Sequence, residues 1–400
     1  MHHVFNARKN VLVTHLGEIM NGIIVHEWME HIGGAERVVD ALRSAYPHAE
    51  VLTLWSNVAD PRIRESWMGR TPLRNNKMLA MPAMLAAWRH QQSGEASWAI
   101  VSSHLFAHHV SFRGASKIPK YVYCHTPARY VWEPELDARG DSALARSAAR
   151  FIKPIDKRRA QEAQGIAANS GFVRDRIANY WQRESTVIYP PVEVEDIQGT
   201  KSWVDLVVGS ETEVLRALPD SYVLGASRFI TYKNLEFAID VAEAAGIPAV
   251  IAGCGPHEAA LRLRARGRKI PVHFVIKPSD ALLRAVMEKA MVLAFGAVED
   301  FGIIPVEAMA LGVPVICGRH GGVLETVLEG TTGFHVDLAP GAHLRTAVEQ
   351  TAALNPARIS EHARKFSRGR FIREIKAWVG ADGSRTEQPF GRPESFILER

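Results

Sequence analysis

Cysteine is scarce in this sequence, and the cysteines that are present do not form a disulfide pattern. Cys124, Cys254 and Cys317 are odd in number, far apart and set in apolar segments, which favours a reduced, cytosolic compartment. Long apolar runs are also absent: even the stretch 286–298 is interrupted by a glutamate and a lysine, so no membrane-spanning helix is predicted. The first nineteen residues lack a signal-peptide pattern, and we expect residues 1–19 to be an extension ahead of the first domain.

Several motifs that would assign a chemistry are missing. The chain has no Gly-x4-Gly-Lys-Ser/Thr run, and no Gly-x-Gly-x-x-Gly opens either half. It also has no Asp-x-Asp pair to hold a catalytic metal. His104, His108 and His109 could share one helical face, but no acidic or cysteine partner lies nearby at ligand spacing. We therefore expect neither a metal nor a cofactor.

The composition is that of an ordinary globular protein. Hydrophobic residues make up 47% of the 400 residues and charged residues 23%, which argues against disorder and suggests two domains. A net charge of +5 permits binding of anions such as nucleotides, nucleic acid or acidic lipid. The basic residues are not interleaved with aromatic ones as in nucleic-acid modules, so nucleic acid is not an expected partner.

Short apolar runs alternate with amphipathic helical segments along the whole chain. This pattern predicts an α/β fold of two doubly wound parallel-sheet domains. The expected strands are residues 22–25, 51–54, 98–102, 121–124, 165–168 and 186–189 in the first half, and 222–225, 250–252, 272–276, 292–295 and 313–317 in the second.

Residues 190 to about 219 lack strong periodicity and carry proline, glycine and acidic residues, which indicates a domain boundary. We predict an N-terminal Rossmann-like domain at 1–195, a linker at 196–219 and a C-terminal Rossmann-like domain at 220–380. The polar residues 381–400 are expected to form a loosely held tail.

Loops that leave the carboxyl ends of the expected strands carry candidate binding residues. Gly33 and Gly34 precede a helix, where backbone N–H groups can approach a phosphate closely. His125 follows one strand, and Arg228 and Lys233 follow another. In open parallel sheets ligands bind at these ends, although a glycine pair is also common turn chemistry and a histidine is more often structural.

Residues 292–326 combine two such loops with two carboxylates. Glu299 follows the expected strand 292–295. Glu307, separated from it by seven residues, lies in a helix that begins near Pro305. The two acids could line a binding site. Alternatively, Glu307 could be a first-turn acid favoured by the helix dipole, and Glu299 and Asp300 a solvated loop tip.

A basic helical segment spans residues 142–163. Its apolar residues at helical spacing are Leu144, Ala148, Phe151, Ile152 and Ile155. A basic amphipathic helix can lie on an anionic membrane. We favour a helix that turns these residues to the core and its charges, between Arg146 and Arg159, to solvent.

Several of these motifs together resemble the retaining glycosyltransferases of family 4, from about residue 22 to residue 379. The most specific segment is Glu299-Asp-Phe-Gly-Ile-Ile-Pro-Val-Glu, the family's Glu-x7-Glu motif. Gly33-Gly-Ala-Glu-Arg-Val, His125-Thr-Pro, Ala168-Asn-Ser, Val187-Ile-Tyr-Pro-Pro-Val and Gly321-Gly-x-x-Glu follow the family's order. His26-Glu-Trp and Cys124-His-Thr-Pro-Ala-Arg-Tyr are similar to bacterial surface-polysaccharide transferases, many of which are mannosyltransferases using GDP-mannose.

The resemblance implies the GT-B architecture, in which two Rossmann-like domains face each other across a cleft, the first on the acceptor side. It implies that Glu299 binds donor-sugar hydroxyls, Glu307 binds the ribose, and Arg228 and Lys233 neutralise the diphosphate. Fixed cations and amide dipoles suit a diphosphate that leaves without a metal. His125 would face the sugar, and the remaining donor contacts would come from the backbone of Gly33, Gly34, Phe301, Gly302 and Ile303. Ser227 stands where the family commonly has glycine, which makes the shape of the Arg228 loop less certain.

The resemblance further implies retaining, metal-independent transfer of a hexose from a nucleoside diphosphate sugar, with GDP-mannose the first candidate. The acceptor would be a glycan or a lipid-linked glycan in surface polysaccharide synthesis, and the enzyme would be cytoplasmic, with peripheral contact to the inner membrane face through Arg146 to Arg159. We expect same-face attack, with the leaving phosphate oxygen assisting deprotonation. A nucleotide-sugar epimerase of the same fold and a non-catalytic nucleotide-binding protein remain as alternatives.

Overall fold

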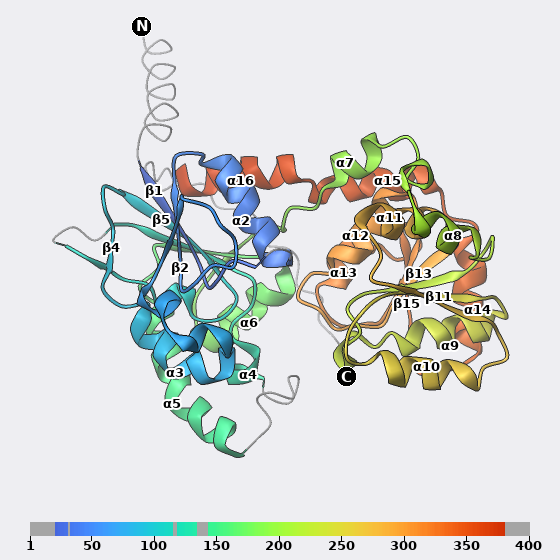
Figure 1. Ribbon diagram of the computed structural model, residues 1–400, viewed down its shortest axis with the longest axis horizontal. Helices are drawn as coiled ribbons and strands as arrows, with labels where there is room; N and C mark the ends of the chain where they lie inside the picture. Colours follow the sequence, from blue (N-terminus) through green and yellow to red (C-terminus); the bar gives the residue numbers. More distant parts are fainter. Residues whose placement is uncertain (1–20, 31–32, 115–117, 134–142, 381–400) are drawn as a thin grey trace, which may run out of the picture.

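The computed structural model describes residues 21–30, 33–114, 118–133 and 143–380 of the chain. Two parallel β-sheets with helices packed on them lie in two domains side by side (Figure 1). The predicted α/β class with two parallel-sheet domains is therefore confirmed. The expected extension at 1–19 and the expected tail at 381–400 lie outside the described residues.

The N-terminal sheet has seven parallel strands in the order β3-β2-β1-β5-β7-β8-β9. Ile24 of its central strand pairs with Val51 on one side and with Ile100 on the other. The central strands are buried along their whole length, as expected for a parallel sheet that is covered on both faces. The strands are β1 (Gly22–His26), β2 (Glu50–Thr53), β3 (Ile63–Glu65), β5 (Trp98–Ser103), β7 (Lys120–Cys124), β8 (Gly165–Ala168) and β9 (Thr186–Val187), with a separate short pair β4 (Gln91–Gln92) and β6 (Phe112–Arg113).

The helices of this domain form where an apolar stripe can cover the sheet. In α2 the stripe consists of Val38, Val39 and Leu42, all fully buried. Ser170 begins another helix, since its Oγ accepts a hydrogen bond from the Val173 N–H at 3.1 Å. The helices are α2 (Gly34–Ala45), α3 (Lys77–Ala87), α4 (Arg129–Trp132), α5 (Ala143–Ala160) and α6 (Gly171–Trp181), with single turns η1 (Trp67–Arg70), η2 (Pro72–Asn75) and η3 (Ala107–His109).

The C-terminal sheet has six parallel strands in the order β12-β11-β10-β13-β14-β15. The strands are β10 (Val223–Ala226), β11 (Ala249–Gly253), β12 (Val272–Ile276), β13 (Val292–Phe295), β14 (Val315–Cys317) and β15 (Gly333–His335). The helices and turns after them are η6 (Thr231–Lys233), α9 (Glu236–Ala245), α10 (Glu258–Arg266), α11 (Asp280–Glu288), α12 (Ile303–Ala310), α13 (Val323–Thr326), α14 (Ala342–Thr351), α15 (Pro356–Ala363) and η7 (Arg364–Phe366).

The predicted linker at 196–219 is not a linker in the structure. These residues fold into most of α7 (Val194–Gly199), then η5 (Val204–Leu206) and α8 (Ser210–Arg216). Apolar side chains along the segment, including Ile197 and Leu215, are buried in the core of the C-terminal sheet. Sequence periodicity missed them because each helix is only two turns or less and so shows little of a repeating stripe.

The last helix, α16 (Arg368–Gly380), packs on the N-terminal domain although it follows the C-terminal one (Figure 1). Its buried residues Phe371 and Ile375 belong to the same apolar cluster as the strands β1 and β7, and Phe371 meets the Tyr123 ring edge-on. The predicted C-terminal domain at 220–380 therefore extends too far, because its last thirteen residues complete the other core.

Helix α5 uses its apolar residues differently from the prediction. Ile152 packs against the N-terminal core, but Phe151 is 76% exposed and Ile155 42% exposed. Ala148, which was also predicted to face the core, is exposed as well. The side chains of Leu144 and Arg146 lie outside the part of the chain that the structure describes. None of the helices described between residues 21 and 380 is long and apolar enough to cross a membrane.

Candidate active site

A cavity of about 450 Å³ opens between the two domains at the carboxyl ends of their strands. Both domains contribute its walls, as expected for open parallel sheets that face each other. Eight of the ten residues predicted for the site line it: Gly34, His125, Arg228, Lys233, Glu299, Phe301, Gly302 and Ile303.

The other two predicted residues, Gly33 and Glu307, stand just behind the cavity wall. Gly33 is the residue before α2, and its backbone carbonyl accepts a hydrogen bond from the Arg37 N–H at 3.2 Å. Glu307 is 4% exposed, and its Oε1 accepts a hydrogen bond from Arg37 Nη1 at 2.6 Å. Burial would lower the pKa of Arg37, but Glu307 raises it. The pair joins the two domains.

Glu299 and Lys233 form an ion pair on the wall of the C-terminal domain. Lys233 comes from the turn η6 after β10, and Glu299 from the loop after β13. Arg228 is exposed on the same side, with Nη2 3.4 Å from the Tyr232 hydroxyl. One carboxylate and two cations therefore stand together, which suits a ligand that carries both hydroxyl groups and negative charge.

The amino terminus of α12 also faces the cavity. Gly302, the residue before the helix, has φ 95°, a left-handed conformation that glycine adopts without strain. The unpaired N–H groups at the start of a helix favour an anion. A side chain at Gly34 of the opposite domain would come within 3.1 Å of Ile303, so the two glycine-bearing loops meet here.

Asp300 binds two arginines of the other domain and is not the solvated loop tip considered above. Its carboxylate accepts hydrogen bonds from Arg129 and Arg176. Arg176 reaches in turn to Glu133, so charges from α4 and α6 converge on the loop after β13. Burial would lower the pKa of Arg129, but Asp300 raises it. This network holds the two walls of the cavity together.

The glycine pair Gly321 and Gly322 supports the Glu299 loop from behind. A β-carbon at Gly322 would lie 2.1 Å from the Asp300 carbonyl oxygen, and one at Gly321 2.7 Å from that of Glu299. Only glycine allows this approach. Glu325, the last residue of the same motif, accepts hydrogen bonds from the Gly171 N–H at 2.7 Å and the Phe172 N–H at 2.9 Å, at the start of α6 in the other domain.

His125 lies on the N-terminal wall as an uncharged ring. Its Nε2 is 2.8 Å from the Ser102 hydroxyl. Burial, together with the neighbouring His104 and His26, lowers the pKa of His125 to about 3. A neutral imidazole can hydrogen-bond a sugar hydroxyl, but this one is too weakly basic to accept a proton near neutral pH.

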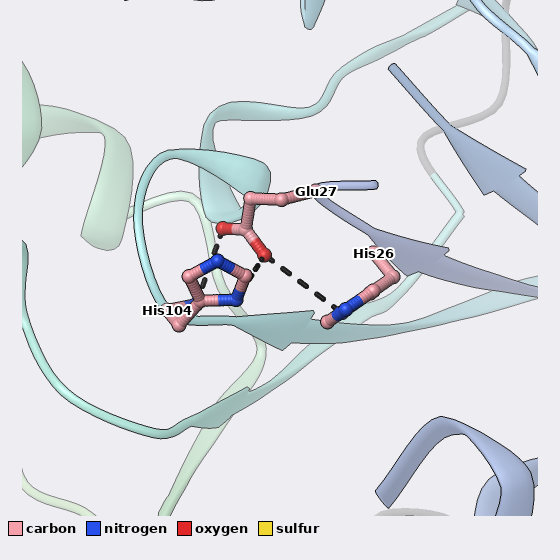
Figure 2. Close-up of side chains that lie close together, drawn as sticks. All are labelled: His26, Glu27 and His104. Carbon is pink, nitrogen blue, oxygen red and sulfur yellow. Dashed lines mark hydrogen bonds and ion pairs between the residues drawn. The ribbon is translucent and has the colours of Figure 1, made fainter. Parts of the chain in front are cut away.

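Figure 2 shows His26, Glu27 and His104 close together, a group that was not predicted from the sequence. Glu27 follows β1 and is fully buried, and its Oε2 lies 3.1 Å from His104 Nδ1. The expectation that His104 has no acidic partner is therefore wrong. The signal was the His-Glu-Trp sequence after the first strand, but the two residues are 77 positions apart and only the pairing of β1 with β5 brings them together.

The same expectation is wrong for His108 and His109, which share the buried carboxylate of Asp156. Asp156 Oδ1 lies 3.1 Å from His108 Nε2 and 2.9 Å from His109 Nε2. Its Oδ2 accepts hydrogen bonds from the indole N–H groups of Trp132 and Trp181. Because protein donors surround this carboxylate on both oxygens, the cluster serves to anchor α5 in the core.

Two glycosyltransferase family models match consecutive parts of the chain. Residues 32–196 match the model described as Glycosyltransferase Family 4, and residues 212–366 match the one described as Glycosyl transferases group 1. Together the two matches take in most of the chain. The chain belongs to glycosyltransferase family 4.

Curated relatives of this family 4 chain include two enzymes named for mannose transfer. It is 26% identical over 262 residues to the alpha-1,3/1,6-mannosyltransferase alg-2 of Neurospora crassa, covering 54% of this chain and 53% of that protein. It is also 26% identical over 246 residues to a GDP-mannose-dependent alpha-(1-6)-phosphatidylinositol dimannoside mannosyltransferase of Mycobacterium tuberculosis, covering 60% and 61%. The chain thus spans little more than half the length of these relatives.

Solved structures confirm the arrangement of the two domains. Anabaena HepE in complex with UDP superposes with a TM-score of 0.65 at 16% identity, covering 90% of this chain and 100% of that one. WaaG, a glycosyltransferase involved in lipopolysaccharide biosynthesis, superposes with a TM-score of 0.56 at 15% identity, covering 90% and 99%. At this identity the likeness concerns the GT-B fold.

Proposed function

We propose that this family 4 chain is a retaining hexosyltransferase that moves mannose from GDP-mannose to a hydroxyl group of a glycan acceptor. The observation that carries the proposal is the cavity between the domains. Its C-terminal wall holds the Glu299 and Lys233 pair, Arg228 and the amino terminus of α12, and its N-terminal wall holds His125.

The C-terminal wall suits the diphosphate of the donor. When the glycosidic bond breaks, negative charge grows on the leaving phosphate, and fixed cations and amide dipoles stabilise that charge without reorganising. Lys233 and Arg228 supply the cations, and the start of α12 supplies the N–H groups. The proposal therefore needs no metal ion for this step.

The sugar and ribose are assigned to the two carboxylates. Glu299 lines the cavity and would bind sugar hydroxyls once Lys233 turns to the phosphates. Glu307, already oriented by Arg37, would bind the ribose hydroxyls through its second oxygen. In this scheme Glu299 positions the donor and forms no covalent intermediate. The acceptor hydroxyl attacks from the face on which the phosphate leaves, which retains the configuration of the anomeric carbon.

The proposal also specifies the sugar and the nucleoside of the donor, mannose and guanosine. They are supported by relatives whose names specify mannose transfer and, for the mycobacterial enzyme, GDP-mannose. The Anabaena structure instead binds UDP, so the base must be tested directly. A thermal-shift panel of GDP-mannose, UDP-glucose, UDP-galactose and ADP-glucose should give its largest rise in Tm with GDP-mannose, because selective binding to the folded state raises apparent stability.

The decisive experiment measures mannose transfer by Glu299→Ala and Lys233→Ala variants. Both should lose transfer while keeping the far-UV circular dichroism of the unchanged chain. Glu258→Ala is a matched control, since this residue of α10 pairs with Arg262 and does not line the cavity. Full activity in either site variant would contradict the roles assigned to Glu299 and Lys233. Products formed without any acceptor, with the nucleotide sugar merely isomerised, would point to an epimerase.

The outer face of α5 supports contact with an anionic membrane, where lipid-linked acceptors for a cytoplasmic enzyme would lie. Phe151 is 76% exposed and Ile155 42% exposed, and the exposed Arg150 and Arg158 stand on the same helix. Apolar side chains flanked by arginines suit the headgroup region of a bilayer. The double variant Arg150→Glu/Arg158→Glu should lose co-sedimentation with vesicles of phosphatidylglycerol, whereas Arg216→Glu on α8 should keep it. Undiminished binding by the double variant would exclude this face.

A further inference from the structure

Glu27 is a fully buried carboxylate next to His104, which lines the cavity. Figure 2 shows the two side chains together. Its Oε1 accepts hydrogen bonds from three backbone N–H groups, those of His104 at 3.1 Å, Leu105 at 2.8 Å and Ala107 at 3.0 Å. The Ser103 hydroxyl adds a fourth at 3.3 Å. Such contacts stabilise the charged form. Burial would raise the pKa of Glu27, but His104, His26 and the backbone donors bring it well below its usual range.

The second carboxylate oxygen is directed at His104. Glu27 Oε2 lies 3.1 Å from His104 Nδ1 as an ion-pair contact. The negative charge beside Nδ1 favours a proton on that nitrogen, so Nε2 is the nitrogen that can act on a bound molecule. The ring lines the cavity, and 27% of the side chain is exposed. Burial would lower the pKa of His104, but Glu27 outweighs it and raises the pKa above its ordinary value.

His104 and His125 therefore have opposite properties although they share one wall. Their ring centroids are 6.3 Å apart, yet the His125 ring lies against the neutral Ser102 hydroxyl, whereas His104 has a carboxylate beside it. A carboxylate in ion-pair contact with an imidazole stabilises the imidazolium that forms when the ring takes a proton. The ionisable groups that face His104 are Glu27 and His26 of the β1 end, Glu36 of α2, Lys77 of α3 and His125.

An indole surface adjoins His104 in the same cavity. Trp28 meets the His104 ring edge-on with centroids 4.9 Å apart, and it is stacked on Trp55 at 5.2 Å. Lys77 Nζ lies 4.4 Å from the centre of the Trp28 ring and pairs with Glu30. Trp28 is only 8% exposed, with its ring packed by Trp55 and Lys77, so it holds the His104 ring in place beside the cavity.

We propose that His104, held by Glu27, binds the attacking hydroxyl of a sugar acceptor and takes its proton during transfer. This proposal rests on the function proposed above and adds to it the acceptor side of the reaction. The acceptor oxygen forms a bond to the anomeric carbon, and the bond from that carbon to the phosphate oxygen breaks. The electron pair leaves with the nucleoside diphosphate, and the proton moves to His104 Nε2. The family resemblance instead gives the proton to the leaving phosphate, so the two routes can be separated.

The test uses the full chain with GDP-mannose as donor and a panel of octyl glycosides as acceptors, and it also follows donor hydrolysis, in which water is the acceptor. His104→Ala should lower kcat for all these acceptors by about 10²- to 10⁴-fold, the usual contribution of a general base. The affinity for GDP-mannose should stay unchanged. His48→Ala is the matched control, since this exposed histidine of the same domain does not line the cavity.

Two further readouts distinguish proton transfer from a purely structural role. Added imidazole should restore part of the activity of His104→Ala, with a rate that rises with the fraction of neutral imidazole. Glu27→Gln removes the negative charge and should move the acidic limb of the kcat profile to lower pH, because that charge raises the pKa of His104. If Glu27→Gln does not fold because the side chain is buried, the imidazole experiment still tests the proton transfer. That experiment uses His104→Ala, a change at a partly exposed residue.

The possible results distinguish a failure of the proposed function from a failure of the proton route through His104. If the unchanged chain neither binds nor turns over any nucleotide sugar, the proposed function fails. If it turns over the donor and His104→Ala does so at the same rate, the proton route through His104 is overturned and the phosphate route stands. Loss of activity in His104→Ala without imidazole rescue would overturn the proton transfer as well, and would leave His104 only a packing role.

Discussion

Glu307 Oε1 of α12 lies 2.6 Å from Arg37 Nη1 of α2, so a carboxylate assigned to the donor ribose is oriented by the opposite domain. Arg284 is the next cation, at 3.9 Å from the same oxygen. Glu307 is nearly buried while the Arg37 side chain is 32% exposed. The contact between the domains therefore passes through the carboxylate that we propose for the ribose.

Removing Arg37 should weaken donor binding. Arg37→Ala leaves Glu307 without its close partner, and hydrogen bonds to charged groups contribute about 1.5–3 kcal/mol, so we expect Kd for GDP-mannose to rise roughly tenfold to a hundredfold. Isothermal titration calorimetry would measure this. Arg43→Ala is the matched control, because Arg43 lies on the same helix but pairs with Asp60. Unchanged or tighter binding by Arg37→Ala would contradict the idea that Arg37 prepares Glu307 for the ribose.

The fold was largely predictable because its strands are short apolar runs with loops at both ends. The run 292–295 is the strand β13 without adjustment, and the pattern of alternation gave the two parallel sheets. The local sequence pattern could not show which other element a buried helix face packs against. Phe371 and Ile375 repeat at helical spacing, but nothing in that spacing says that they pack on the N-terminal sheet.

Like the fold, the site could be predicted from the sequence only in part. Glu299, Lys233 and Arg228 could be placed because each follows a strand whose carboxyl end points into the cleft. Asp300 could not be assigned, since its partners Arg129 and Arg176 lie 171 and 124 positions away. Glu27 and His104 were missed for the same reason. Long-range ion pairs depend on the relative position of elements, which a single sequence does not encode in its local period.

Gly322 should be essential for activity although it touches no substrate. Its φ of −65° is open to any residue, so Gly322→Ala acts only through the β-carbon, which would lie 2.1 Å from the Asp300 carbonyl oxygen. The Glu299 loop must move to avoid it, and a shift of about 1 Å at a site can cost about 10²-fold in rate. Steady-state kinetics would show this loss in kcat. Gly267→Ala, where a β-carbon meets nothing within 4 Å, should leave the rate unchanged, and equal rates for the two variants would contradict the supporting role.

Asp156 should be among the most sensitive positions for stability. Its buried carboxylate faces two histidine rings and two indole N–H groups, so Asp156→Asn replaces an acceptor oxygen by a donor that faces other donors. A hydrogen bond to a charged group contributes about 1.5–3 kcal/mol, and the loss of several at Asp156 corresponds, for a domain of this size, to a fall in Tm of roughly 10 °C. Differential scanning calorimetry would measure it, with the exposed Asp175→Asn as control. A Tm within about 2 °C of the unchanged chain would show that the cluster is not the anchor of α5.

Stability should fall as the pH is lowered from 7 towards 4. Burial lowers the pKa of His26 and His109 to about 4 and that of His125 to about 3, whereas an unfolded histidine titrates near about 6.5. Between these values the unfolded chain binds protons that the folded chain does not, so the free energy of unfolding decreases with falling pH. His104 and Glu36 oppose this, because burial raises the pKa of Glu36 and the Glu27 carboxylate raises that of His104.

Urea unfolding followed by circular dichroism at pH 7, 6 and 5 would measure the slope, and each unit of pKa shift corresponds to about 1.4 kcal/mol at full effect. His26→Gln removes one histidine whose pKa is lowered and should flatten the slope over this range, because the variant no longer gains that proton on unfolding. A free energy of unfolding that stays constant from pH 7 to pH 5 would mean that these rings are not held neutral in the fold.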